Sequence, residues 1–172
     1  MNKIILIGMT ATALALGACG KKTPPADIGP VVTDPNAGAA TPADENVDLV
    51  ELPAMQADMI AKAGSDTVYF GTDKSDVDTP ARTTLAAQAR WMLANPSVKG
   101  SIEGHADERG TREYNLALGE RRANSAKNFL IASGVPAARL TVISWGKERP
   151  AAVGSNENAW AQNRRSVTVV VR

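Results

Sequence analysis

The chain has 172 residues, a formal net charge of +1, one cysteine and one histidine. A net charge this close to zero does not indicate a nucleic-acid partner. A lone cysteine excludes an internal disulfide, and one cysteine with one histidine is too few for a zinc or thiol-redox site. We therefore expect no metal and no cofactor.

The first residues, MNKIILIGMTATALALGAC, have the pattern of a secretory signal peptide. One cation, Lys3, precedes an apolar run of about a dozen residues, which is too short to span a bilayer of roughly 30 Å. The ending Leu16-Gly17-Ala18-Cys19 resembles the bacterial lipobox, in which cleavage precedes the cysteine. We therefore predict a signal peptide over residues 1–18 and a lipid anchor on Cys19. An ordinary secreted protein with a stray cysteine is the alternative.

Residues 19–51 have the composition of a disordered tether. They contain five prolines and no aromatic residue, and residues 20–51 carry two lysines against six acidic residues. Such a segment buries too little apolar surface to offset its ordering entropy. Residues 52–172 carry 16 basic and 12 acidic residues and all seven aromatic residues. We therefore predict a single folded domain over residues 52–172.

Apolar periodicity and turn residues predict eight elements in this domain. Thr111 is the expected N-cap of the longest helix, and Gly134 is its expected stop. The predicted order is helix 53–63, strand 67–70, helix 81–94, strand 99–103, helix 112–133, strand 141–145, helix 156–162 and strand 167–172. This order favours an α/β two-layer sandwich, with a small mixed four-stranded sheet and two long helices on one face.

The stretch GHADERGTREYNLALGERRA (residues 104–123) concentrates charge at one strand-to-helix corner. On the long helix, small and apolar residues at spacings of three and four predict the buried stripe, which is Gly119, Ala123, Ala126 and Leu130. A second stripe, Asn115, Leu118 and Arg122, is expected to flank the core and open to solvent. Asp107 lies in the loop before the helix.

This corner combines a carboxylate, a guanidinium and the backbone donors of a helix N-terminus. The combination suits a ligand that carries both an ammonium and a carboxylate, because an arginine fork binds both carboxylate oxygens. A purely structural ion pair between Asp107 and Arg122 is the alternative. Catalysis is not indicated: no G-x-S-x-G elbow is present, and the adjacent Asp107 and Glu108 are poorly placed to face each other across a sugar.

The same stretch, together with SWGKERP (residues 144–150) and NRRSV (residues 163–167), resembles the OmpA-like peptidoglycan-binding domain family over about residues 68–172. The resemblance implies that the ligand is the diaminopimelate of the peptidoglycan stem peptide. It further implies that Asp107 binds the ammonium and Arg122 the carboxylate, and that Asn115 hydrogen-bonds the ligand or a loop. Phe70 and Gly71 would form the pocket wall, with Leu118 beside it.

Lipoprotein members of the family imply an outer-membrane anchor that binds peptidoglycan, maintains envelope integrity and acts in constriction during division, with TolB and TolA as partners. A protein-binding envelope scaffold is the alternative. His105 is either a ligand contact or a strand-end histidine, and Arg109 with Glu108 is expected to brace the loop. Arg121, Arg164 and Arg165 are predicted at the surface, and Trp91 and Trp160 in the core.

Overall fold

The computed structural model describes residues 45–172, with side chains from residue 51 onward. The predicted signal peptide, the lipidation site Cys19 and the tether up to residue 44 lie outside the described residues. Within residues 45–172, no helix is both long and apolar enough to cross a membrane.

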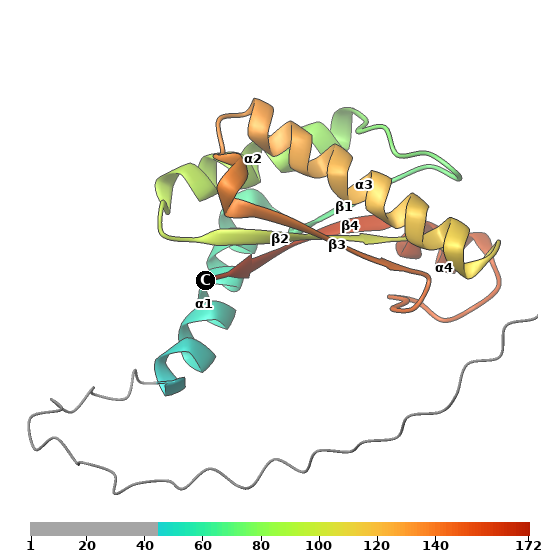
Figure 1. Cartoon of the computed structure of the whole chain (residues 1–172), viewed down its shortest axis with the longest axis horizontal. Helices are drawn as coiled ribbons and strands as arrows, with labels where there is room; N and C mark the ends of the chain where they lie inside the picture. The colour runs from blue at the N-terminus through green and yellow to red at the C-terminus, as the bar shows by residue number, and fades with distance from the viewer. Residues whose placement is uncertain (1–44) are drawn as a thin grey trace, which may run out of the picture. The chain divides into compact units, whose positions relative to one another are not determined.

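Nine elements follow one another in the described chain (Figure 1). They are α1 (Glu45–Ala63), β1 (Thr67–Tyr69), α2 (Thr79–Ala94), β2 (Lys99–His105), α3 (Arg112–Ala132), the 3-10 turn η1 (Ala137–Arg139), β3 (Leu140–Gly146), α4 (Glu157–Asn163) and β4 (Arg165–Val171). Each predicted helix and strand is present, and apart from the start of α1 their ends differ by at most two residues.

The four strands form one mixed sheet in the order β1-β4-β2-β3. β2 and β3 are parallel, and β4 runs antiparallel to both of its neighbours. The crossover between the parallel strands is α3, which lies with α2 over one face of the sheet (Figure 1). The predicted two-layer α/β sandwich with a mixed four-stranded sheet is confirmed.

The predicted start of the first helix was too late. α1 begins at Glu45, so residues 45–51 of the predicted tether are helical, and Pro53 lies inside the helix instead of at its start. Packing of Leu52, Met55 and Met59 against the core anchors the later turns. The acidic residues that made the segment resemble a tether also favour a helix N-terminus, because they complement its dipole.

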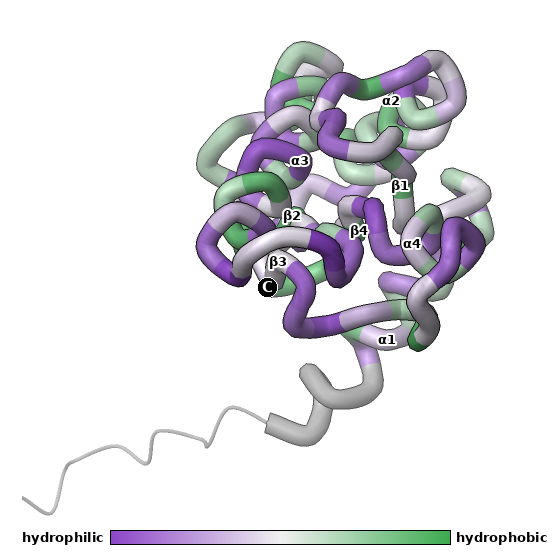
Figure 2. Tube along the Cα trace, turned by 90° about the vertical axis from the view of Figure 1, so that its right-hand side faces the viewer, coloured by the Kyte–Doolittle hydropathy of each residue, from purple (hydrophilic) through white to green (hydrophobic). Residues whose placement is uncertain are grey.

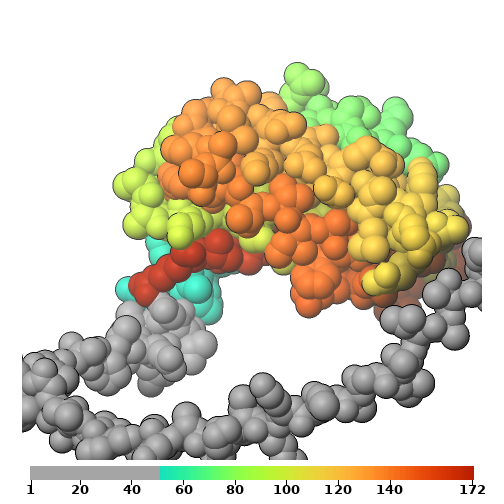
Figure 3. Space-filling view, viewed as in Figure 1, coloured from blue at the N-terminus to red at the C-terminus, as the bar shows by residue number. Residues whose placement is uncertain are grey.

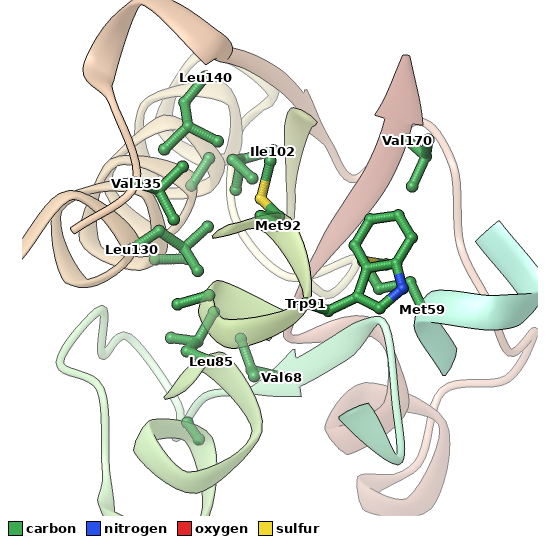
Figure 4. Packing of buried hydrophobic residues seen from close by; sticks show 14 of the residues in the cluster. Met59, Val68, Leu85, Trp91, Met92, Ile102, Leu130, Val135, Leu140 and Val170 are labelled. Carbon is green, nitrogen blue, oxygen red and sulfur yellow. The ribbon is translucent and has the colours of Figure 1, made fainter. Parts of the chain in front are cut away.

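The core fills the space between the helices and the sheet. Ile102 of β2 and Met92 of α2 lie beside Leu140, with Trp91 and Met59 farther along the layer (Figure 4). Trp91 is buried as predicted, and its indole N–H donates to Asp58 Oδ2 at 2.7 Å.

α3 is largely hydrophilic along its length (Figure 2), yet it lies close to the sheet. Its predicted buried stripe is confirmed: Gly119 faces Gly104 of β2, and Ala123, Ala126 and Leu130 are buried. The Thr111 hydroxyl caps the helix by accepting from the Tyr114 N–H at 3.2 Å. Gly134 follows the helix with φ 101°, a left-handed conformation that glycine adopts readily. These features let α3 pack closely on the sheet and fix the position of the loop between β2 and α3.

Candidate functional site

The loop between β2 and α3 holds Asp107 in a cage of arginines. Arg109 donates from Nε to Asp107 Oδ1 at 3.0 Å and from Nη2 to Oδ2 at 2.7 Å, and its backbone N–H adds a bond of 3.1 Å. Arg164 Nη1 lies 3.6 Å from Asp107 Oδ2. Burial opposes ionisation of Asp107, but the bonds from Arg109 and the charges of Arg109 and Arg164 outweigh it and lower its pKa. Asp107 is therefore a fixed anion at neutral pH.

Arg122 lies deeper than predicted. It is 0% exposed, whereas we expected it to border solvent. Its guanidinium donates to three backbone carbonyls: Nε to Lys74 at 2.8 Å, Nη1 to His105 at 2.8 Å and Nη2 to Gly71 at 3.0 Å. These carbonyls belong to two segments far apart in the sequence. The arginine therefore ties the loop after β1 to the end of β2.

The Arg122 charge has no direct counter-ion in the described part of the chain. Within residues 51–172 no carboxylate lies within the 4 Å of an ion pair with Arg122, so the alternative of an Asp107–Arg122 contact pair is wrong. Burial lowers the Arg122 pKa to about 10, with Asp107 and Asp73 opposing this effect from a distance. Arg122 therefore stays protonated at neutral pH.

The other two members of the second stripe are buried as well. Asn115 is buried and donates from Nδ2 to the Arg109 carbonyl at 2.7 Å, so it braces the loop. Leu118 is buried, and the prediction that this stripe opens to solvent is wrong for all three residues. The reason is that the loop after β1 folds over this side of α3, where Arg122 holds its carbonyls.

Phe70 and Gly71 reach the site through their backbone. The Phe70 carbonyl accepts from Arg164 Nε at 3.1 Å, and the Phe70 ring lies 5.4 Å from the Arg122 guanidinium carbon. Both residues also line a hollow of about 400 Å³ beside Tyr69 and α4. That hollow has a different set of lining residues from the pocket at Asp107.

A smaller pocket of about 270 Å³ opens directly beside Asp107. Its walls are Thr72, Asp73, Asp107, Arg109, Gly110 and Tyr114. Asp73 has a φ of 54° and accepts from the Tyr114 hydroxyl at 3.2 Å. A larger hollow of about 550 Å³ lies between α1 and the end of α2, lined by residues that include Trp91 and Arg172, and it contains none of the charged corner.

Several residues at this corner were not predicted from the sequence. Arg164 was expected at the surface but is buried, with Nη2 on Glu157 at 2.6 Å. Trp160 was expected in the core, but it is half-buried and stacks on Arg109 at 4.1 Å, while its N–H donates to Glu108. Arg109 therefore braces the loop as predicted, but its carboxylate partner is Asp107 and not Glu108. The NRRSV motif marked Arg164 and Arg165 as residues of interest, although sequence alone could not tell which of the two arginines is buried.

His105 ends β2 behind the pocket. Its side chain is 2% exposed, neither ring nitrogen has a hydrogen-bond partner among the described residues, and Nε2 lies 3.8 Å from a Glu103 oxygen. It does not line the pocket, so it is the strand-end histidine of the two alternatives. Burial and the charges of Arg165 and Arg149 lower its pKa to about 4.

We expect this histidine to make the domain sensitive to acid. It is the only histidine, and it takes up a proton more readily in the unfolded chain, where its pKa is about 6.5, than in the fold, where its pKa is about 4. Stability should be constant above that range and fall by about 3 kcal/mol in total as the pH drops from about 6.5 to about 4. Urea unfolding at several pH values measures this, and His105→Gln should remove most of the slope across this range. If the slope of stability against pH is unchanged in His105→Gln, groups other than His105 cause the acid sensitivity.

The described residues thus form an α/β sandwich with a charged pocket at a strand-to-helix corner. The model of the OmpA family matches residues 69–164. The chain belongs to the OmpA family.

Within that family the chain is similar to peptidoglycan-associated lipoproteins. It is 44% identical to the one from Mesorhizobium japonicum over 96% of this chain and 90% of the relative. It is 41% identical to the one from Brucella melitensis over 99% and 97%. The crystal structure of the peptidoglycan-associated lipoprotein from Burkholderia pseudomallei is 40% identical with a TM-score of 0.61, covering 63% of this chain and 92% of that one.

Proposed function

We propose that this chain is an outer-membrane lipoprotein, and not an enzyme, that holds peptidoglycan non-covalently through the diaminopimelate of the stem peptide. The names of its relatives and its near-full-length similarity to them support this function. The lipid on Cys19 would fasten the chain to the outer membrane, and the tether would let the folded domain reach the wall.

The single observation that carries the proposal is a carboxylate in an open pocket, together with a buried cation that has no direct counter-ion among residues 51–172. Arg122 is a buried charge whose direct partners are all neutral carbonyls, an arrangement that a ligand carboxylate would balance. It uses three of its five N–H groups on these carbonyls, so two remain. Asp107 lines the pocket as a carboxylate for an ammonium. A diaminopimelate side chain ends in one ammonium and one carboxylate, which matches both charges.

Arg109 is the cation that lines the pocket, whereas Arg122 is buried and is not among its walls. The Arg109 side chain is 40% exposed. A ligand ammonium would compete with Arg109 for the Asp107 oxygens, and the displaced guanidinium would lie beside the ligand carboxylate. Stacking on Trp160 at 4.1 Å holds Arg109 close enough for this exchange.

Sedimentation with purified sacculi tests the wall contact. The test uses residues 20–172, because the helix that begins at Glu45 must stay whole. Asp107→Asn keeps the shape and removes the charge, so we expect about a tenfold to hundredfold weaker association. Glu120→Gln removes the same charge from the exposed side of α3 and should pellet like the parent chain.

Each of two results would contradict the proposal. One is a folded parent chain that stays in the supernatant, and the other is an Asp107→Asn variant that pellets as the parent does. Free diaminopimelate should release the parent chain from sacculi. A parent chain that does not sediment with sacculi but is retained by immobilised TolB would favour the alternative function, a protein-binding envelope scaffold.

We further propose TolB and TolA as partners, with a role in constricting the outer membrane during division. This extension rests on the resemblance to lipoprotein members of the family, and we expect the surface around the Asp107 pocket to serve both the wall and TolB. Binding of one would then exclude the other. Sacculi and TolB added together to the parent chain test this, since full-strength binding of both at once contradicts it.

A further inference from the structure

The SWGKERP motif (residues 144–150) ends β3 and continues into the turn that follows, and it contacts both sides of the loop between β2 and α3. The Gly146 carbonyl accepts from the Ala106 N–H, at the start of this loop, at 2.8 Å. The Ser144 hydroxyl donates to the Leu116 carbonyl of α3 at 2.6 Å. In Figure 3 the orange surface that includes the end of β3 lies against the yellow surface of the start of α3. The motif therefore supports the loop from below the helix start.

Lys147 of this motif holds the middle of the loop. Its ammonium donates to the Gly110 carbonyl at 2.8 Å and to the Glu108 carbonyl at 3.2 Å. Asn115 of α3 donates to the carbonyl between them, that of Arg109, at 2.7 Å. Three successive carbonyls are thus bound by side chains from outside the loop, which fixes three successive planar peptide groups.

Lys147 lies on a different side of the loop from the Asp107 pocket. It is not among the walls of that pocket, and instead it lines, with Glu108, a separate hollow of about 210 Å³. Because it is a charged donor, its bonds to the carbonyls are stronger than those of a neutral amide. Lys147 would therefore act on a ligand in the Asp107 pocket through the loop backbone.

The proposed exchange at Asp107 is the step at which these bonds matter. Without a ligand, the Arg109 side chain holds both Asp107 oxygens and so braces the loop internally. A ligand ammonium that takes the place of Arg109 removes this brace. The Lys147 bonds go to backbone carbonyls, so the exchange leaves them intact.

We propose that Lys147 is a positioning residue for wall binding. By holding the Glu108 and Gly110 carbonyls, it keeps Asp107 directed into the pocket while the ligand ammonium displaces Arg109. This inference rests on the proposed function. A loop without the Lys147 bonds adopts additional conformations, and the ligand binds only the fraction of molecules that presents Asp107, so the apparent affinity falls by that fraction.

Calorimetric titration of the whole chain in mild detergent with a soluble muropeptide that contains diaminopimelate tests the inference. Lys147→Met keeps the aliphatic stem and removes the ammonium, so we expect about tenfold weaker binding. Lys147→Arg keeps a cation with several donors and should bind within about threefold of the parent chain. Lys99→Met removes the same charge from an exposed position at the other end of β2 and should bind as the parent does.

Hydrogen–deuterium exchange separates positioning from a general loss of stability. In Lys147→Met the amides of residues 106–112 should exchange faster, while those of β4 exchange as in the parent chain. Lys147→Gln, whose shorter side chain cannot span both carbonyls, is the second variant if Lys147→Met does not fold, and the same loss of affinity is expected.

Three results would overturn the inference, and they are distinguishable. If the parent chain binds the muropeptide and the folded Lys147 variant binds it equally well, the role of Lys147 is wrong and the proposed function stands. If weaker binding comes with faster exchange in β4 as well as in the loop, Lys147 has only a structural role. A folded parent chain that does not bind the muropeptide contradicts the proposed function and this inference together.

Discussion

Replacing Gly104 with alanine is expected to destabilise the domain strongly. A Cβ on Gly104 would lie 1.8 Å from the Gly119 carbonyl oxygen and 2.6 Å from its carbonyl carbon. Both contacts are with the backbone of α3, so no side chain can move away, and the helix must lift from β2. We expect a loss of about 4 kcal/mol or more, which is a large part of the about 5–15 kcal/mol that stabilises an ordinary domain.

Gly100→Ala is the matched control on the same strand. Its Cβ would meet Met92 Cε at 3.1 Å and Leu140 Cδ2 at 3.2 Å, which are the ends of flexible side chains. We expect a loss of about 1 kcal/mol there. Urea unfolding followed by circular dichroism measures both variants. Equal stability of the two would show that α3 does not depend on its close approach to β2.

Removing the Arg122 guanidinium is the second change with a large expected effect. Burial lowers the Arg122 pKa to about 10, which corresponds to about 3 kcal/mol against the charged form. Three hydrogen bonds from a charged donor to the carbonyls of Gly71, Lys74 and His105 are worth about 1.5–3 kcal/mol each. The bonds outweigh the burial cost, so Arg122→Met should destabilise the domain by about 3 kcal/mol.

Arg121→Met is the control for this change. It removes the same charge from the neighbouring, exposed position, and we expect an effect within about 0.5 kcal/mol. Urea unfolding of the two variants compares them directly. If Arg122→Met were as stable as Arg121→Met, the three carbonyls would not depend on the guanidinium, and Arg122 would be free to serve a ligand alone.

Arg122 both holds the loop after β1 and is proposed to bind the ligand carboxylate, and this affects how the site can be tested. Loss of wall binding in an Arg122 variant would mix a lost ligand contact with a loosened loop after β1. Asp107→Asn keeps the shape of the side chain, but its amide nitrogen donates where a carboxylate oxygen accepts from Arg109, so thermal unfolding must confirm the fold of this variant. Asp107 still gives the clearer measurement of the pocket, because it lines the pocket and Arg122 does not.

The sequence by itself determined most of the architecture. The spacing of Gly119, Ala123 and Ala126 identified the buried stripe of α3, and Thr111 and Gly134 marked its ends. These signals are local, because each depends on helix periodicity or on the backbone preference of one residue. The charged stretch before and within α3 likewise pointed to the family to which the chain belongs.

Only the tertiary structure decided which charges are buried and what they contact. Arg121 and Arg122 are adjacent and identical in type, yet one is exposed and the other binds carbonyls contributed by residues 48 and 51 positions away. Arg164, expected at the surface, is buried with Nη1 3.6 Å from Asp107 Oδ2 for the same reason. Burial of a cation depends on whether distant segments bring enough acceptors to one point. That convergence is a property of the closed fold, and no local pattern in the chain encodes it.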